Sequence, residues 1–445
     1  MTPPKPVSRR SLLSSGLVAG AAAVGARISR SAAAPTPAGT APTTTAPATV
    51  PAQPSQIIVP NGAVMPYTTR AGVKVFHLVA EPINHELTTG LHIKAWGYNG
   101  RTPGPVIEVT QGDRCRFYVT NKLPEPTSLH WHGIILPNGM DGVAGLTQKS
   151  IGPGQTFKYE FTFRHAGTFM YHPHSDEMTQ IALGMTGMIV VHPRRPVTSP
   201  GNAGRRIRDY ALMLHEWKIP IGTDRPDPLA MNDFNVLTFN SKAYPATMPL
   251  IAQVGDLVRM RFGNLGPMDH HPIHMHGHVF AITETDGGTV PLSARVPETT
   301  VLVPTGSVRV VEFVAAEPGD WPMHCHMTHH AMNQMGHDMA NLIAADVRGL
   351  DAKLNRVVPG TMVMGQSGMG GMQEMNMAQP RNSVSMAGGQ GPFGPIEMGG
   401  MFTMIKVRER IKDDAAATAS WHQAPAGTRA IEATTAELAA DGIKI

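Results

Sequence analysis

The sequence predicts an all-β protein that contains two β-sandwich domains, and three observations lead to this prediction. From about residue 56 the chain is made of short runs such as RCRFYVT, TFKYEFTF and VRVVEFVAA, separated by Gly, Pro and Asn. Such runs predict strands joined by turns, whereas convincing amphipathic helices are few. Two successive blocks also share one layout, which indicates a duplicated domain. Many short strands with regular turn signals are typical of sandwiches.

Before these blocks, the first 34 residues have the layout of a twin-arginine signal peptide. Arg9 and Arg10 precede a weakly apolar stretch at 17–24, and small residues follow at 31–34. A disordered basic tail is the alternative. We therefore expect export to the periplasm or the extracellular space by the twin-arginine route. The apolar stretch is too short to serve well as a permanent membrane span, and no later segment reads as one.

The distribution of charge argues against a nucleic-acid partner. The formal net charge is +4, and the first 34 residues contain five basic and no acidic side chains. Subtracting these five leaves about −1 for the rest of the chain, which has no clustered basic stripe that could bind phosphates.

Composition and the repeated layout divide the chain into parts. Each block contains a strand, a Gly-Asp turn (Gly112-Asp113 or Gly255-Asp256), another strand and two His-x-His clusters. The expected parts are a signal peptide at 1–34, a Pro/Ala/Thr-rich linker at 35–55, a first domain at 56–196, a second domain at 205–347, a Met/Gly-rich segment at 348–405 and a C-terminal tail of unassigned role at 406–445.

Four histidine clusters indicate a metal centre with several ions. On a strand, residues i and i+2 point to the same face, so each His-x-His pair presents two imidazoles side by side. An isolated pair is more often structural, but four pairs supply eight imidazoles, which suit copper, zinc, iron or nickel. Eight exceed what a single tetrahedral zinc ion needs. The eight are His130, His132, His172, His174, His274, His276, His324 and His326.

Cys325 indicates a second metal site, because on a strand its sulfur points away from the side chains of His324 and His326. Two histidines, a cysteine thiolate and a weak axial methionine form a blue-copper site. That set is supplied by His271, Cys325, His330 and Met335. The peptide bonds that flank Cys325 would give a short covalent route between the two sites. The other cysteine, Cys115, lies in an alternating run and is expected to be a buried apolar residue.

The motifs HWHG, YHPH, HPIHMHGH and HCHMTHHAMNQM resemble, in this order, the four copper-binding motifs of the multicopper oxidases, the family of the laccases. Other stretches, such as TPGPVIEV and PGDWPMHCH, also resemble sequences of this family. The resemblance covers about residues 56 to 347. It implies two cupredoxin-like domains with a Greek-key β-sandwich fold. It also implies a copper cofactor of four ions per functional unit: one of type 1, one of type 2 and two of type 3.

The resemblance also implies a role for each ligand. His130 and His274 correspond to the type 2 ligands. The type 1 ligands correspond to His271, Cys325, His330 and Met335. The ligands of the type 3 pair correspond to His132, His172, His174, His276, His324 and His326. His278 has no ligand role in the family, and surface or hydrogen-bonding roles are favoured for His270, His329 and His337.

Asp141 matches the acid that the family places near the type 2 copper, and we expect it to be catalytic as a proton source. The alternative is a plain turn residue before Gly142. Some relatives carry a second acid in the HCH-x-x-x-H loop, where this chain has the residues MTH. Asp176 or Glu177, which follow YHPH closely, is the candidate replacement.

Enzymes of this family take single electrons at the type 1 copper and reduce O2 to water at the other three ions, and Cys325 matches the residue through which the electrons leave. The resemblance implies phenols, aromatic amines or cuprous ion as substrates, and an axial Met335 implies a low-to-middle reduction potential. Only 97 positions separate His174 from His271, which leaves no room for the middle domain of three-domain laccases. Two-domain relatives build the three-copper cluster between subunits of a homotrimer, and a monomer with an internal interface is the alternative.

Two other functions fit part of the pattern. Two-domain copper nitrite reductases carry the cysteine motif in the first domain, whereas this chain has Pro173 at that place in YHPH. A non-catalytic copper-binding or storage protein would not need eight paired imidazoles.

Ten methionines lie in the Gly-rich segment after the second block, and thioethers select cuprous copper. We expect this segment to capture cuprous ion in the service of copper tolerance. The alternatives are a passive low-complexity flap and a shield over the substrate pocket. The methionines are Met362, Met364, Met369, Met372, Met375, Met377, Met386, Met398, Met401 and Met404.

Overall fold

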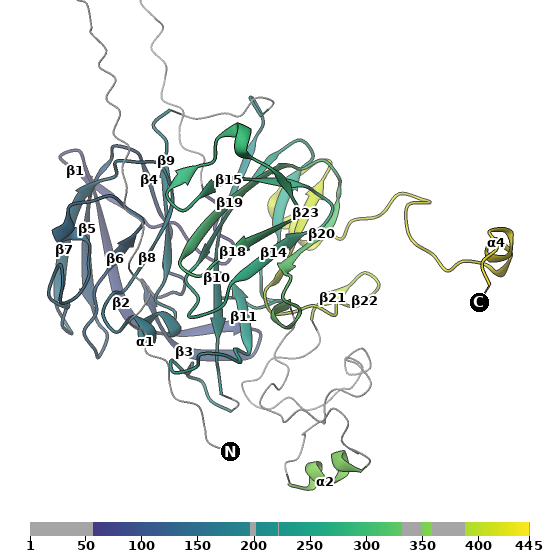
Figure 1. The fold of residues 1–445 in the computed structure, drawn as a ribbon, viewed down its shortest axis with the longest axis horizontal. Coiled ribbons are helices and arrows are strands. Elements are labelled where there is room, and N and C mark those ends of the chain that lie inside the picture. Colours follow the sequence, from purple (N-terminus) through teal and green to yellow (C-terminus); the bar gives the residue numbers. More distant parts are fainter. Residues whose placement is uncertain (1–56, 196–201, 221, 332–348, 358–387, 445) are drawn as a thin grey trace, which may run out of the picture. The chain divides into compact units, whose positions relative to one another are not determined.

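The computed structural model describes residues 57–195, 202–220, 222–331, 349–357 and 388–444 (Figure 1). Strands dominate these residues, as predicted, and each helix is short. The helices are α1 (Glu177–Ala182), α2 (Leu350–Val357), α3 (Asp414–Ala419) and α4 (Thr435–Ala440), with 3-10 turns η1 (Asn138–Met140), η2 (Leu292–Ala294) and η3 (Thr328–Ala331). The expected signal peptide and linker, and Met335 of the expected type 1 set, lie outside the described residues.

The first sandwich consists of two sheets. One sheet has the order β1-β2-β5-β7, with β3 also paired to β2, and the other has the order β4-β9-β8-β6. Their bounds are β1 Thr68–Arg70, β2 Val73–Thr88, β3 Leu91–Tyr98, β4 Ile107–Thr110, β5 Arg114–Asn121, β6 His130–His132, β7 Thr156–Thr162, β8 Gly167–His172 and β9 Gly187–His192. Helix α1 lies in the connection from β8 to β9.

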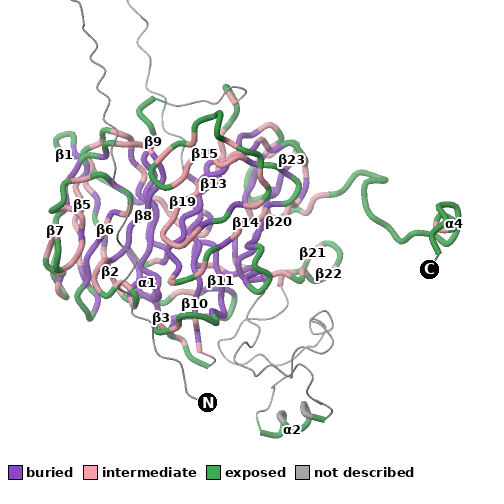
Figure 2. Tube along the Cα trace, viewed as in Figure 1, coloured by how far each residue is buried: buried purple, intermediate pink, exposed green. Residues whose placement is uncertain are grey.

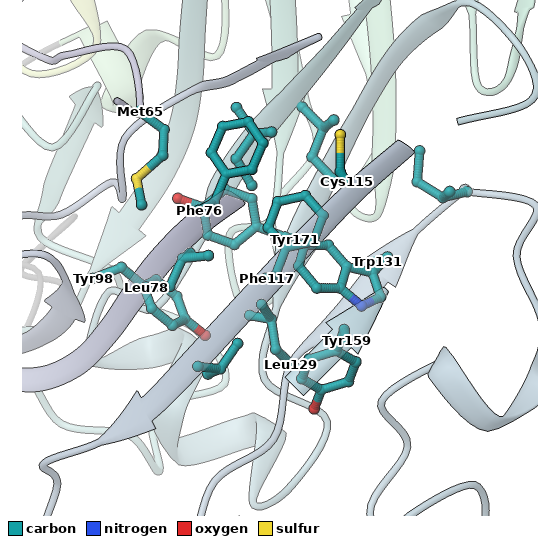
Figure 3. Packing of buried hydrophobic residues seen from close by; sticks show 14 of the residues in the cluster. Met65, Phe76, Leu78, Tyr98, Cys115, Phe117, Leu129, Trp131, Tyr159 and Tyr171 are labelled. Carbon is teal, nitrogen blue, oxygen red and sulfur yellow. The ribbon is translucent and has the colours of Figure 1, made fainter. Parts of the chain in front are cut away.

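Buried residues that alternate with more exposed ones along the strands form the core of this sandwich. On β5, Cys115 and Phe117 are buried while Arg114 is exposed, as a strand with one face to the core requires. Phe117 stacks on the ring of Phe76 from β2, with ring centroids 4.9 Å apart (Figure 3). Trp131, which lies between two of the candidate metal ligands, packs against Phe117 in the same core. The prediction that Cys115 is a buried apolar residue is confirmed.

The second sandwich repeats the arrangement. One sheet has the order β11-β10-β13-β19-β15-β16, with β17 paired to β15, and the other has the order β12-β23-β20-β14-β18. The bounds are β10 Ile207–Trp217, β11 Val236–Phe239, β12 Leu250–Gln253, β13 Leu257–Asn264, β14 His271–Met275, β15 Phe280–Thr285, β16 Gly288–Thr289, β17 Pro297–Glu298, β18 Thr300–Val303, β19 Ser307–Val314, β20 Gly319–Cys325 and β23 Phe402–Arg408. A separate hairpin consists of β21 (Gln390–Gly391) and β22 (Gly394–Pro395).

The two Gly-Asp turns are equivalent in structure. Gly112 and Gly255 have φ angles of 91° and 92°, a region that favours glycine. The following aspartate folds back in each case, so that Asp113 and Asp256 each accept a backbone N–H at 2.7 Å. Strand β5 runs parallel to β2, and β13 runs parallel to β10. These matching details support the duplication inferred from the sequence.

The expected boundary of the second domain at residue 347 is wrong, because β23 belongs to this sandwich. Strand β23 pairs with β20 and runs parallel to β12, just as β9 pairs with β8 and runs parallel to β4. Ile405 and Val407 of β23 are buried in the second core. Figure 2 colours the strands of both sandwiches by how far they are buried. The methionine-rich stretch is therefore an insertion between the last two strands of the sandwich. Its length separates β23 from the rest of the second block, so the repeated layout in the sequence does not predict the run FTMIKVR as the last strand.

Apolar and charged contacts join the two sandwiches. Met170 of the first and Val310 of the second belong to one buried cluster. Arg261 on β13 donates to both carboxylate oxygens of Asp209 on β10, at 2.7 and 2.9 Å, and also donates to Thr168 on β8. A buried ion pair needs such additional hydrogen bonds to offset the loss of hydration. These contacts fix β8, which ends in the YHPH motif, against the second sandwich.

Among the residues described, none of the helices has the length and hydropathy needed to cross a lipid bilayer.

Candidate metal centres

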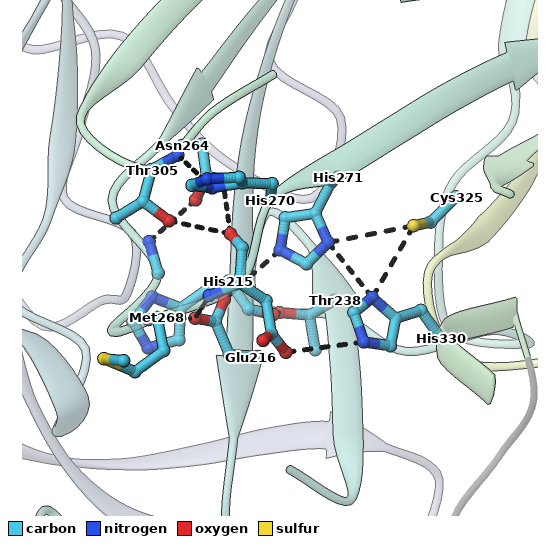
Figure 4. A network of polar contacts seen from close by, with 12 residues as sticks. His215, Glu216, Thr238, Asn264, Met268, His270, His271, Thr305, Cys325 and His330 are labelled. Atoms are coloured by element: carbon cyan, nitrogen blue, oxygen red, sulfur yellow. Dashed lines mark hydrogen bonds and ion pairs between the residues drawn. The ribbon is translucent and has the colours of Figure 1, made fainter. Parts of the chain in front are cut away.

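Two imidazole nitrogens converge on the sulfur of Cys325, the last residue of β20. His271 begins the neighbouring strand β14, and His330 follows in the turn η3. The Cys325 Sγ atom lies 3.8 Å from His271 Nδ1 and 3.6 Å from His330 Nδ1, and the two nitrogens are 3.3 Å apart (Figure 4). All three side chains are buried. We call this group the thiolate site.

The donor atoms of the thiolate site fit one small metal ion. Bonds of about 2.0–2.3 Å that radiate from one ion within a plane place three donors about 3.5–4 Å apart, close to the observed separations. One thiolate with two imidazoles is the donor set of a blue-copper site. Burial raises the pKa of the Cys325 thiol to about 12, so metal binding must displace the thiol proton.

The backbone of Met401 holds the loop of the thiolate site in place. Its carbonyl accepts the N–H of Cys325 at 3.1 Å, and its N–H donates to the carbonyl of His330 at 2.9 Å. Its side chain is fully buried in the second core. The expectation that Met401 captures cuprous ion is therefore wrong. Of the other nine methionines, Met398 and Met404 are partly buried, and the remaining seven lie outside the described residues.

Paired strands bring four histidines of the first sandwich together, and we call them the first histidine set. His130 lies opposite His172 in the register of β6 and β8. His132 Nδ1 is 3.2 Å from His172 Nε2, and the ligand atoms of these three histidines all lie within 4.8 Å of one another. The ring centroid of His174 lies 5.6 Å from that of His130.

The second histidine set repeats this geometry in the second sandwich. His274 lies opposite His324 in the register of β14 and β20. His276 Nε2 is 3.3 Å from His324 Nε2, which corresponds to the close pair in the first set. The ring of His326 lies 5.3 Å from that of His274. His276 and His326 are exposed.

Carbonyl groups fix the tautomer of two histidines in each set. A carbonyl oxygen can only accept, so an Nδ1 atom that contacts one carries the proton and leaves Nε2 as the ligand atom. These contacts are His130 to Asp141 at 2.8 Å, His172 to Pro173 at 2.9 Å, His274 to Thr299 at 2.8 Å and His324 to Cys325 at 2.9 Å. Burial also lowers the pKa of His172 to about 3, which keeps this imidazole in the neutral form that binds metal.

The two histidine sets line different cavities. The first set opens into a cavity of about 490 Å³ that is also lined by Leu229, Met231 and Met268. His274 and His276 of the second set line a separate and more open cavity of about 360 Å³, together with Val279. Within the described part of the chain, no ring contact or hydrogen bond joins a histidine of one set to a histidine of the other. Each set therefore supplies half of the eight imidazoles that the sequence predicted for one cluster.

Two of the candidate acids reach the first histidine set. A carboxylate oxygen of Asp141 lies 3.5 Å from His130 Nδ1. The carboxylate of Glu177, at the start of α1, lies 3.3 Å from His172 Nδ1 and 3.7 Å from His174 Nε2. Asp176 is exposed and has a left-handed backbone with φ 45°. Of the two candidate replacements for the second acid, Glu177 is thus the one that faces the histidines.

The structure adds one residue that the sequence analysis missed and separates other histidines from the sites. Glu216, in the run HEW of β10, lies 3.2 Å from His271 Nε2, and nothing in that run distinguishes it from an ordinary strand residue. His278 accepts two backbone N–H groups at 3.3 Å, and His270 accepts that of Thr305 at 3.1 Å. His337 lies outside the described residues.

Two cupredoxin-like sandwiches with a Cys-His-His site and two sets of paired imidazoles define a copper-binding class of protein. Family models described as multicopper oxidase match residues 80–196 and 220–344, together more than half of the chain. The chain belongs to the multicopper oxidase family, and copper is the cofactor that this family implies.

Individual relatives agree with this family. The chain is 40% identical to copper resistance protein A of Escherichia coli over 129 residues, which are 29% of this chain and 20% of that protein. It is 32% identical to the multicopper oxidase MmcO of Mycobacterium tuberculosis over 222 residues, which are 43% of this chain and 42% of that protein. The matched part is thus between a fifth and about two fifths of the length of these relatives.

Among solved structures, the blue copper oxidase from Nitrosomonas europaea is similar in fold. The two share 26% sequence identity and superpose with a TM-score of 0.55, over 75% of this chain and 85% of that one. The predicted all-β fold with cupredoxin-like sandwiches is confirmed.

Proposed function

We propose that the protein is a laccase-like oxidase that couples one-electron oxidation of phenols, aromatic amines or cuprous ion to the reduction of O2 to water. The observation that carries the proposal is the placement of Cys325 between His324 and His326, which joins the thiolate site to the second histidine set through the backbone. Bound copper would supply one-electron acceptance at the thiolate site and O2 reduction at the histidine cluster. The residues of the chain hold the donors, keep His172 neutral and place Asp141 as a proton source.

The ligand roles belong to the same proposal. The thiolate site, with Met335, would hold the type 1 copper, and His130 with His274 the type 2 copper. The type 3 pair would be held by His132, His172, His174, His276, His324 and His326. Glu177 is the proposed second acid, because its carboxylate contacts two of these histidines. Nitrite reduction gains no support at the first set, where Pro173 stands between the two histidines.

A homotrimer is the assembly that we propose for the oxidase. Each cluster would combine the first histidine set of one subunit with the second set of the next, and three equivalent interfaces close the ring. Two observations support this assembly. The two sets line separate cavities in one chain, and the rim of the first cavity exposes Leu229 and Met231, which are 72% and 71% accessible. Apolar side chains at such a rim favour contact with a neighbour.

Location and copper tolerance complete the proposal. Arg9 and Arg10 in the first 34 residues support export by the twin-arginine route to the periplasm or the extracellular space. Capture of cuprous ion is assigned to the methionines from Met362 to Met386, since Met401 is part of the core.

Oxygen uptake by the copper-loaded protein tests the proposal. It would be measured with cuprous ion and with a small phenol, for the whole chain and for a variant that lacks residues 361–387. This deletion leaves Met401 and β23 in place. If cuprous oxidation falls while phenol oxidation holds or rises, the segment captures copper. If the whole chain and the deletion variant oxidise each substrate at the same rate, the segment has no role in the oxidase reaction. The absence of uptake with either substrate, although the blue absorption is present, would refute the oxidase.

A further inference from the structure

A fully buried carboxylate lies behind the thiolate site. Glu216 is the second-last residue of β10 and is 0% exposed. One of its oxygens accepts the backbone N–H groups of Met268 at 2.7 Å and Asp269 at 2.8 Å. The other oxygen lies 3.2 Å from Nε2 of His271 (Figure 4). The loop from β13 to β14 therefore folds around this carboxylate and leads directly into a copper-ligand position.

The surroundings of Glu216 are built for a carboxylate. An isolated charge in the interior costs several kcal/mol, and here three N–H donors offset that cost through hydrogen bonds to the charged group. The backbone of the loop approaches very closely at Gly266. A Cβ atom at this position would lie 1.8 Å from a Glu216 oxygen, so a larger residue would displace the carboxylate.

His271 is held from two sides. Its Nδ1 atom faces Cys325 and His330, and its Nε2 atom faces Glu216. Because a carboxylate accepts the bond, Nε2 carries the proton and Nδ1 keeps its lone pair for a metal ion. Such a partner also makes the imidazole a stronger donor, and a nearby negative charge favours the more positive oxidation state of the bound ion.

The other imidazole of the thiolate site has a weaker partner. Asp269 Oδ2 lies 3.4 Å from His330 Nε2, but the side chain of Asp269 is 27% exposed. Solvent screens a charge at such a position far more than one at a fully buried position. The two carboxylates are therefore not equivalent, and Glu216 exerts the larger electrostatic effect.

We propose that Glu216 is a positioning residue that fixes the orientation of His271 and lowers the reduction potential of the type 1 site. This inference rests on the proposed assignment of copper to the thiolate site. It concerns a property of that site that can be measured without O2 reduction.

Redox titration of the blue absorption in copper-loaded Glu216→Gln tests this role. Glutamine keeps an oxygen that can accept the two backbone N–H groups but removes the charge. At a fixed ambient potential we expect the ratio of reduced to oxidised copper to rise about tenfold, which is 59 mV for a one-electron couple. The matched control is Asp256→Asn, which changes a buried carboxylate in the turn before β13 that binds Arg206. The control should unfold at a lower temperature but keep the ratio within about threefold of the unmodified protein.

A shift of less than threefold in Glu216→Gln, or an equal shift in Asp256→Asn, would overturn the inference while leaving the copper assignment intact. If Glu216→Gln does not fold or bind copper, Glu216→Asp replaces it. Aspartate keeps the charge but withdraws it by one methylene from His271, so the ratio should move in the same direction by a smaller factor. An unchanged ratio in that variant would also overturn the inference. A lack of blue absorption in the unmodified protein would refute the copper assignment itself, and the inference with it.

Discussion

The two cysteines of the chain are both fully buried, yet only one lies beside metal-binding groups. Cys325 has two imidazole nitrogens within 3.8 Å, whereas Cys115 packs in the aromatic core of the first sandwich. Burial raises the pKa of both thiols to about 12, so burial does not distinguish them. What distinguishes Cys325 is its place at the end of β20, beside the start of β14 and the turn η3.

Replacing each cysteine by serine separates the copper role from packing. Cys325→Ser should abolish the blue absorption and O2 uptake, because a hydroxyl does not replace a thiolate as a soft ligand. Cys115→Ser buries a hydroxyl in an apolar core and should lower the free energy of unfolding by about 1–3 kcal/mol, with the blue absorption retained. Absorption spectra and urea unfolding would check both expectations. Retained blue absorption in Cys325→Ser would rule out the thiolate site.

Asp141→Asn should slow O2 reduction without altering the thiolate site. Removing a positioned proton donor typically lowers the rate by about 10²-fold or more, and the blue absorption should persist because Asp141 contacts the first histidine set. Asp176→Asn serves as the control. Asn tolerates the left-handed backbone at this exposed position, so its turnover should equal that of the unmodified protein. If the turnover of Asp141→Asn equals that of the unmodified protein, Asp141 is only a turn residue and not a proton source.

At the residue scale, short motifs predicted the candidate ligands, whereas their partners could not be predicted. The period of two along a strand places both histidines of a His-x-His pair on one face, and β6, which holds His130 and His132, follows this rule. Glu216 contacts His271 across 55 positions of sequence and from a different sheet. Such a contact depends on how the two sheets pack, which no local pattern records.

Strand β23 is the element in which sequence and structure differ most. In the first sandwich, residues 173–186 connect β8 to β9, whereas residues 326–401 connect the corresponding strands β20 and β23. The runs GMIVVH and FTMIKVR share their methionine, isoleucine and valine. This likeness is a signal for the missing strand, but the length of the insertion separates the run from the second block.

Ile405→Ala tests whether β23 stabilises the second sandwich. Ile405 is fully buried between β12 and β20, so its truncation should lower the free energy of unfolding by about 2–5 kcal/mol. Glu409→Ala, at an exposed position directly after the strand, should change this free energy by no more than about 0.5 kcal/mol. Urea unfolding monitored by tryptophan fluorescence would measure both. Equal stability of the two variants would argue that β23 is dispensable.

At the scale of the whole molecule, the duplicated layout was predictable, but the relative placement of the two histidine sets was not. That placement depends on the arrangement of complete domains. The proposed homotrimer predicts complementation between His172→Ala, which damages the first set, and His276→Ala, which damages the second. Each variant alone should be inactive.

Mixing and refolding the two variants in equal amounts should restore activity. In a ring trimer, an interface is intact when one subunit supplies an undamaged first set and the next subunit supplies an undamaged second set. In an equal mixture each condition is met about half of the time, so about a quarter of the unmodified activity should return. Oxygen uptake together with light scattering would test this expectation. A monomer with an internal cluster would stay inactive at every mixing ratio.

The insertion between β20 and β23 also affects how the chain folds. Closing a loop that is roughly five times longer costs about 1.5 kcal/mol more in chain entropy. The cost is small enough for long insertions to be tolerated, but contacts between distant parts of the chain form slowly. Because Met401 holds the N–H of Cys325 and the carbonyl of His330, the thiolate site is completed only after this closure. Copper binding during refolding should therefore lag behind the burial of tryptophan in the first sandwich, which stopped-flow absorption and fluorescence can compare.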